Sequence, residues 1–265
     1  MLRGVERYSS GAAAAQNASA EAGLHARVLD HLGTAICGGE LPPGSILNID
    51  ELVDRYAVSR SVVREVLRVL ASIGFIETRR RVGVTIRTAD AWNVFDPQVI
   101  RWRLASAGRI AQIRSITELR TAIEPHAAWL AADRIGHDEA SELVGLAAKM
   151  WAAGKAGDEE RFLRLDIEFH QRVLAASGNE MFVKLQDLVA EVLSGRHHYN
   201  LMPHHPHEQA LQLHADVAQA IQRRDGERAR SAMVEIMEHA FDEMKAIWEK
   251  AADPAVGDGE MLLRP

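Results

Sequence analysis

The chain has 265 residues, 47% of them hydrophobic and 26% charged, and its formal net charge is −6 at pH 7. This length is enough for two domains, and the acidic balance argues against a protein that coats nucleic acid over its whole surface. The longest apolar stretches fall short of the roughly 20 residues that span a bilayer, so neither a transmembrane helix nor a membrane partner is expected.

The N-terminal residues 1–21 are rich in alanine, serine and glycine and lack the apolar core of a signal peptide, so we expect a disordered arm. From Leu24 to Cys37 apolar residues recur at helical spacing, and a second short helix is expected from Glu51 to Tyr56. Cys37 is the single cysteine, which excludes an intrachain disulfide and is typical of the reducing cytoplasm. We therefore expect a cytoplasmic protein.

The sequence VSRSVVREVLRVL predicts a third helix with a functional face. Ser59 is a good N-cap, and the helix from Arg60 to Ile73 carries a stripe that we expect to be buried, formed by Val62, Val63, Val66, Leu67, Leu70 and Ile73. Arg60, Arg64 and Arg68 are spaced by four residues and therefore share one exposed face. A helix, a turn and a second helix with arginines is the geometry that places side chains against base edges in the major groove.

A basic hairpin is expected directly behind this helix, because Phe75 to Thr78 and Val84 to Arg87 alternate as two short strands. Residues 55–87 carry eight arginines against two glutamates, or +6, which leaves −12 for the rest of the chain. Such a module suits phosphate and minor-groove contacts, although scattered arginines on a solvated domain are the plainer alternative. The expected DNA contacts are Ser59, Arg60, Ser61, Arg64, Arg68, Arg79, Arg80, Arg81 and Gly83.

PPGS followed by VSRSVVREVLRVLASIGFIETRRRVGVTI resembles the winged helix-turn-helix of the GntR family of bacterial transcription regulators. One departure is visible, because Leu47-Asn48-Ile49-Asp50-Glu51 stands where the family has a Leu-Pro-x-Glu start to its second helix. The departure affects a helix cap and leaves the DNA-reading residues intact. The resemblance implies a DNA-binding domain of three helices and a β-hairpin wing over residues 22–88.

Residues 89–110 are expected to be a connector, and they are too apolar for a free linker. From residue 111 to 252 strand alternation is absent, and helical segments are separated by glycine and proline cues. We expect a mostly α protein whose second domain is an all-helical antiparallel bundle, followed by a flexible tail at 253–265. The expected helices of the bundle are Ile113–Ile135, Asp138–Ala153, Asp158–Ala176, Met181–Tyr199, His207–Arg223 and Gly226–Ala251.

Four residues of the bundle could hold a metal. Asp166 and His170 lie one helical turn apart, and His214 and His239 lie among apolar residues on two later helices. One carboxylate and three imidazoles suit zinc, nickel, manganese or iron. The plainer alternative is a set of hydrogen-bonded core histidines.

The segments ELRTAIEPHAAWLAADR, DIEFHQRVLAASGN and HADVAQAIQRRDGERARSAMVEIMEH resemble the effector-binding FCD domain of the FadR-type branch of the GntR family. In many members an aspartate, a histidine one turn later and two later histidines hold a metal. Asp166, His170, His214 and His239 match these positions. The resemblance therefore implies a divalent metal, for which zinc is the expected ion.

Arg120 is a candidate anion clamp, since a guanidinium can hold a carboxylate by two parallel hydrogen bonds. A structural salt bridge with Glu124, four residues on, is an equal alternative, and Glu124 is included in the expected effector site. The histidine-rich loop from His197 to His207 could line the mouth of a cavity or be a polar solvated segment. Further candidates for effector contacts are Arg172, Arg196 and His198.

We expect a ligand-responsive, sequence-specific DNA-binding regulator, a repressor, that binds an inverted repeat as a homodimer. WNVFDPQVIRW resembles a stretch of family members that regulate sugar-acid catabolism, such as galactonate-operon repressors, so the expected effector is a small organic acid such as an aldonate. A metal-dependent hydrolase is the competing class, but no catalytic residue is expected because no acid, base or nucleophile motif is present. A third possibility is a purely structural metal in a bundle that only dimerises.

Overall fold

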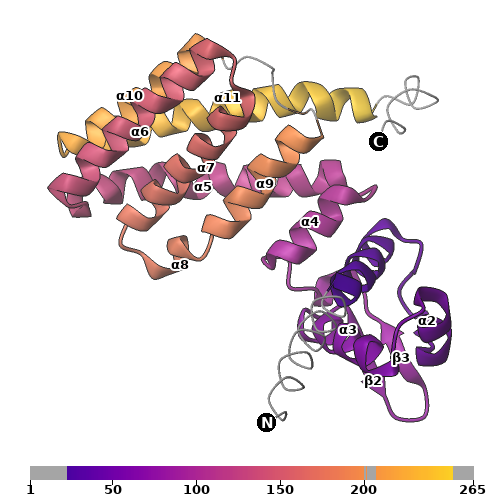
Figure 1. The fold of residues 1–265 in the computed structure, drawn as a ribbon. Helices are drawn as coiled ribbons and strands as arrows, with labels where there is room; N and C mark the ends of the chain where they lie inside the picture. Colours follow the sequence, from indigo (N-terminus) through magenta and orange to yellow (C-terminus); the bar gives the residue numbers. More distant parts are fainter. Residues whose placement is uncertain (1–22, 200, 202–206, 253–265) are drawn as a thin grey trace, which may run out of the picture. The chain divides into compact units, whose positions relative to one another are not determined.

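The computed structural model describes residues 23–199, 201 and 207–252, and the chain divides into two compact units, Met1–Gly108 and Arg109–Pro265 (Figure 1). The predicted arm at 1–21, the tail at 253–265 and the loop histidines His204 and His205 lie outside the described residues. The predicted fold class is confirmed, with a winged helix-turn-helix followed by a helical bundle. Within the described residues, every helix is too short or too polar to cross a membrane.

The helices of the first unit begin at polar caps. Residues 23–38 are helical and are followed by α2 (Ile49–Tyr56) and α3 (Arg60–Ser72). The Asn48 side chain accepts a hydrogen bond from a backbone amide in the first turn of α2, and Ser59 does the same for α3. Ser59 is thus the N-cap that the sequence predicts, whereas α2 begins two residues before the expected start.

The wing contains one strand more than the sequence predicts. Strands β1 (Ile46–Leu47), β2 (Ile76–Arg79) and β3 (Gly83–Ile86) form an antiparallel sheet in the order β1-β3-β2. Arg79 pairs with Gly83, which leaves a three-residue turn in which Arg81 has a φ of 69°. The predicted hairpin is therefore β2 and β3, and the two-residue β1 pairs with the other edge of β3.

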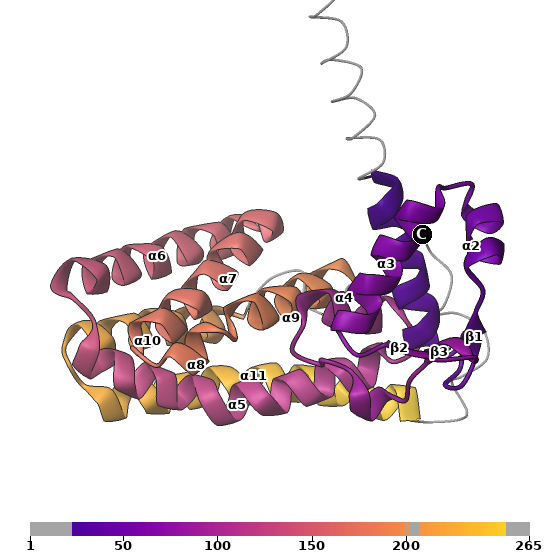
Figure 2. The same cartoon turned by 90° about the horizontal axis from the view of Figure 1, so that it is seen from below.

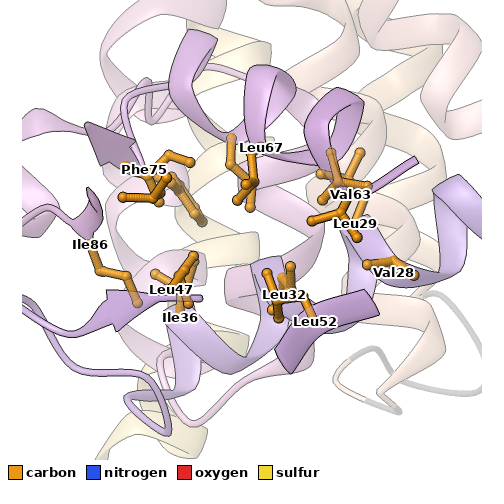
Figure 3. Close-up of a cluster of buried hydrophobic side chains, with 14 of the residues drawn as sticks. Val28, Leu29, Leu32, Ile36, Leu47, Leu52, Val63, Leu67, Phe75 and Ile86 are labelled. Carbon is orange, nitrogen blue, oxygen red and sulfur yellow. The ribbon is translucent and has the colours of Figure 1, made fainter. Parts of the chain in front are cut away.

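The core of the first unit lies between α3, the sheet and the helix at residues 23–38. Figure 3 shows Leu32, Val63, Leu67 and Phe75 among the side chains of this cluster. All six apolar residues of the predicted α3 stripe are buried, and each such side chain stabilises the fold by roughly 1.5–3 kcal/mol. Cys37 packs against the same core, and burial raises the pKa of its thiol to about 12.

The first part of the predicted connector packs on the DNA-binding core. It contains a 3-10 turn, η1 (Ala89–Ala91), and helix α4 (Pro97–Ala105). Trp102 of α4 is buried, and its indole Nε1 donates to Asp30 Oδ1 at 2.9 Å. The ring fits only because residue 33 is glycine, since a Cβ there would lie 2.2 Å from the indole. Helix α4 is therefore part of the first unit.

Gly74 ends α3 at a position that tolerates no side chain. Its φ is +83°, and a Cβ would lie 2.1 Å from the Ala91 carbonyl oxygen. We expect Gly74→Ala to lower the free energy of unfolding by more than the roughly 1–2 kcal/mol that a left-handed conformation alone costs. Gly39→Ala is the matched control, with a φ of +81° and nothing within 4 Å of its Cβ. Equal urea midpoints for the two variants would contradict the expected clash.

The second unit is a helical bundle organised around α5, which packs along α11 and also contacts α7, α9 and α10 (Figures 1 and 2). Helix α10 packs on both α6 and α11, and α6 packs on α7. Side chains of α5, α7, α9, α10 and α11 therefore meet in the interior. The helices are α5 (Arg109–Arg134), α6 (His137–Ala156), α7 (Glu159–Ala176), α8 (Glu180–Val183), α9 (Gln186–His198), α10 (Glu208–Gln222) and α11 (Gly226–Ala252).

One predicted helix of the bundle is divided. The sequence predicts a continuous helix over Met181–Tyr199, but the structure has a break at Lys184 and Leu185 between α8 and α9. Gln186 Nε2 donates to the Gln171 carbonyl at 2.6 Å, and Gln171 Nε2 donates back to the Gln186 carbonyl at 3.4 Å. This exchange ties the start of α9 to α7, a tertiary contact that helical periodicity does not reveal.

Candidate metal centre and effector cavity

The second unit contains a cavity of about 90 Å³ in the interior of the bundle. At roughly 15 Å³ for each enclosed water, this space could hold about six water molecules or a small organic ligand. Its polar lining comes from five helices and includes both cations and anions. The polar and charged lining residues are Arg120, Glu159, Asp166, His170, Arg196, His197, His207, His214, His239 and Glu243.

Three of the four predicted metal ligands meet in this cavity. Helix α7 carries Asp166 and His170 one turn apart, and α10 places His214 beside them. Asp166 Oδ1 lies 3.2 Å from His214 Nε2 and 3.5 Å from His170 Nε2. Ligand atoms of these three residues all lie within 4.8 Å of one another, and each residue is at most 5% exposed. His239 of α11 is half-buried and lines the same cavity, outside this close group.

Each of the two histidines has an acceptor oxygen close to its other ring nitrogen. His214 Nδ1 lies 2.7 Å from the Ala210 carbonyl oxygen, which only accepts hydrogen bonds, and His170 Nδ1 lies 2.5 Å from Glu124 Oε2. A metal would be bound with the histidine protons at Nδ1, which leaves the two Nε2 atoms and the Asp166 carboxylate as its ligands. One carboxylate and two imidazoles are ligands that a divalent metal takes, so the donor set fits such an ion.

The charges of the site depend on one another. Burial raises the pKa of Glu124, but Arg120 and His170 lower it further, to about 2. Burial likewise disfavours the charged form of Asp166, yet hydrogen bonds from His170 and His214 hold its pKa below the usual range. For His170, burial lowers the pKa, but the carboxylates of Glu124 and Asp166 raise it to about 9. Both acids are therefore ionised at neutral pH, and the negative charge of Asp166 favours a cation beside it.

Arg120 forms the salt bridge with Glu124 and also lies in the cavity lining. Its Nε donates to Glu124 Oε1 at 2.5 Å and its Nη2 to Glu124 Oε2 at 3.5 Å, and both side chains are buried. Arg120 also lines the cavity, whereas Glu124 lies behind His170 and contacts its Nδ1. The structure therefore places Glu124 as a support for a candidate ligand, away from the cavity lining.

Of the remaining candidates for effector contacts, some line the cavity and others do not. Arg172 is half-exposed on α7, binds Glu142 and Glu168, and is absent from the cavity lining. His198 is exposed, and its ring meets the ring of Tyr199 edge-on. Two other members of the predicted histidine loop, His197 and His207, do line the cavity.

Arg196 is the arginine of α9 that enters the cavity. It is only 3% exposed, and its Nη2 donates to Glu243 Oε2 at 2.9 Å. In the part of the chain that the structure describes, its Nε has no hydrogen-bond partner. The sequence offers little to distinguish Arg196 from Arg172, since both are arginines within predicted helices.

All nine predicted DNA contacts are exposed on α3 and the wing. Three of the arginines are engaged in surface ion pairs, Arg60 with Asp50, Arg68 with Glu65 and Arg79 with Glu77. Among the described residues, Arg64, Arg80 and Arg81 have no such partner. Their guanidinium groups are therefore available to phosphates or base edges without the loss of an internal contact.

Glu124→Gln is expected to weaken metal binding without changing a metal ligand. The amide keeps the shape of the side chain but removes the charge that orients His170 and neutralises Arg120. We expect the zinc affinity to fall by about 10- to 100-fold, the range for lost partners of metal-bound histidines. Calorimetric titration with zinc measures this, with Glu168→Gln as the control because Glu168 binds Arg172 on the surface. Equal zinc affinity in both variants would contradict the support role.

Two family models match the chain. The model described as bacterial regulatory proteins, gntR family, matches residues 24–86, and the FCD domain model matches residues 115–239. The first match covers the helix-turn-helix and the wing but not α4, and the second covers the bundle from α5 into α11, including all four predicted metal ligands.

Curated relatives and solved structures agree with these models. The galactonate operon transcriptional repressor of Escherichia coli (strain K12) is 28% identical over 223 residues, or 83% of this chain and 96% of that protein. The HTH-type transcriptional repressor RspR of the same strain is 26% identical over 215 residues, 80% of this chain and 85% of that protein. The E. coli McbR/YncC structure has a TM-score of 0.50 at 20% identity and covers 85% of this chain and 98% of that chain, which supports the fold.

Proposed function

We propose that this protein is a repressor controlled by a metal-bound organic acid. The premise is that the chain belongs to the GntR family of bacterial transcription regulators and carries an FCD domain. The observation that carries the proposal is the donor set in the cavity. Asp166, His170 and His214 place three ligand atoms within 4.8 Å of one another, and each histidine has an acceptor oxygen close to its other ring nitrogen. A zinc ion held there would act as a Lewis acid for carboxylate oxygens. Nickel, manganese and iron suit the same donors.

The protein residues of the cavity are suited to an acid bound beside such a metal. Arg120 lines the cavity and supplies guanidinium donors, while apolar residues of α7, α9, α10 and α11 form much of the remaining wall. Planar, charged donors bind carboxylates in a defined orientation. A sugar acid is the class that we propose, and its support is the similarity to a relative that is named for the galactonate operon.

On the DNA side, we propose that a homodimer binds an inverted repeat. Two copies of α3 related by a two-fold axis match the two halves of a palindromic site. The exposed arginines of α3 would enter the major groove, and those of the wing would contact the backbone or the minor groove. The effector can change DNA affinity only by binding unequally to the DNA-competent and incompetent states.

A thermal-shift screen of sugar acids with and without chelator tests the proposed effector site. A ligand that binds the folded state raises the melting temperature, and we expect aldonates to do so only when zinc is present. If an aldonate still raised the melting temperature in chelator, the acid would bind without the metal. Zinc-dependent turnover of esters or phosphates without DNA binding would favour the hydrolase alternative instead.

A further inference from the structure

Arg196 carries a buried hydrogen-bond donor that the protein does not use. The side chain lies in the last turn of α9, lines the cavity, and has no partner for its Nε among the described residues. Arg196 is only 3% exposed, and this burial lowers the pKa of its guanidinium. A buried charged donor without a hydrogen bond costs free energy. We therefore expect the Arg196 Nε to donate to an acceptor atom of a ligand or a water molecule.

The partner of Arg196 decides which kind of acceptor fits. Glu243 of α11 holds Arg196 Nη2 at 2.9 Å, and it lines the same cavity. A second carboxylate placed against Arg196 would meet the negative charge of Glu243. A hydroxyl group meets no such repulsion, because its oxygen accepts from Arg196 Nε while its proton is donated to a carboxylate oxygen of Glu243.

We propose that Arg196 and Glu243 form a hydroxyl-binding subsite, so that the ligand of this cavity is a hydroxylated carboxylate and not a simple fatty or dicarboxylic acid. The subsite lies on α9 and α11, whereas the close metal-ligand group lies on α7 and α10. The carboxylate of the ligand belongs at the metal, and a hydroxyl further along its chain belongs at Arg196 and Glu243. This inference rests on the proposed effector site and adds the feature of the ligand that the site selects.

Selection follows from the buried state of Arg196. A ligand without the hydroxyl leaves the Nε donor unpaired and displaces any water that served it. Sites built to bind a hydroxyl reject the analogue that lacks it far more strongly than apolar pockets reject a change in size. Glu243 is partly exposed, so we expect discrimination of at least about tenfold, below the limit of a fully enclosed site.

The test compares gluconate with hexanoate, two six-carbon monocarboxylates that differ in their hydroxyl groups, by calorimetry on the zinc-loaded full chain. We expect gluconate to bind at least about tenfold more tightly. Arg196→Gln and Glu243→Gln should each weaken gluconate binding by about tenfold or more and change hexanoate binding less than about twofold. Arg172→Gln is the matched control, because Arg172 is absent from the cavity lining, and it should change neither.

The possible outcomes separate the subsite from the proposed function. If both acids bind the wild-type protein equally, or if Arg196→Gln weakens both equally, the cavity is an acid site and the hydroxyl subsite is wrong. If neither acid nor any aldonate binds the zinc-loaded protein, the effector site itself is wrong. If Arg196→Gln does not fold, Glu243→Gln alone tests the subsite. This variant is expected to fold because Glu243 is partly exposed and the amide preserves the shape of its side chain.

Discussion

Replacing His214 with alanine is expected to weaken zinc binding by more than about 100-fold, beyond the effect of losing a residue that only orients a ligand. His214 Nε2 is directed at Asp166 Oδ1 and is the only ligand atom that α10 contributes to the close group. Without it, the close group keeps only two ligand atoms, fewer than the three protein ligands of an open zinc site. Calorimetric titration of the variant with zinc measures the loss.

Two further variants show whether the effect belongs to the site. His126→Ala is the control, because His126 is exposed on α5 and stacks on Trp129. It should leave the zinc affinity unchanged. His239→Ala should weaken zinc binding as well, because its imidazole lines the cavity and can complete four-coordination. Zinc affinity of His214→Ala equal to that of His126→Ala would contradict the metal centre.

Replacing Arg64 with alanine is expected to weaken binding to a specific operator by about 5- to 150-fold, corresponding to the roughly 1–3 kcal/mol of a bidentate contact to a base. Arg64 lies on the exposed face of α3 and has no ion-pair partner among the described residues, whereas Arg68 is held by Glu65 at 2.5 Å. Fluorescence anisotropy with a site selected from random DNA measures the loss.

Arg80→Ala provides the contrast to Arg64→Ala. Arg80 lies in the turn of the wing, where a guanidinium contacts phosphates in any sequence, so its loss should be similar on specific and random DNA. The slope of log affinity against log salt should also fall by about 1. A uniform loss for Arg64→Ala as well would show that α3 does not read bases.

Local sequence patterns predict those features of the fold that depend on one element at a time. The α3 stripe follows from apolar spacing, and Ser59 follows from the preference of hydroxyl side chains for helix starts. The same holds for Asp166 and His170, because residues four apart on a helix share a face. Strand β1 is different, since two residues show no alternation and pair with β3 only through the folded sheet.

Features that depend on packing between distant helices are harder to predict. Arg196 and Glu243 are 47 residues apart in the sequence. In the fold α9 and α11 line the same cavity, and this distinguishes Arg196 from a surface arginine such as Arg172. Glu124 is predicted to contact the effector, but the contact of α5 with α7 places it behind His170. Its role as a support depends on the ring orientation of that histidine, which sequence spacing does not specify.

Operator affinity as a function of acid and metal is the most direct test of a repressor controlled by a metal-bound organic acid. The measurement is the dissociation constant of the full chain for a selected operator, with and without gluconate or galactonate, in zinc and in chelator. We predict that an aldonate weakens operator binding at least about tenfold in zinc and has no effect in chelator. Operator affinity that stays the same while the acid binds at the zinc-loaded site would contradict the proposed control.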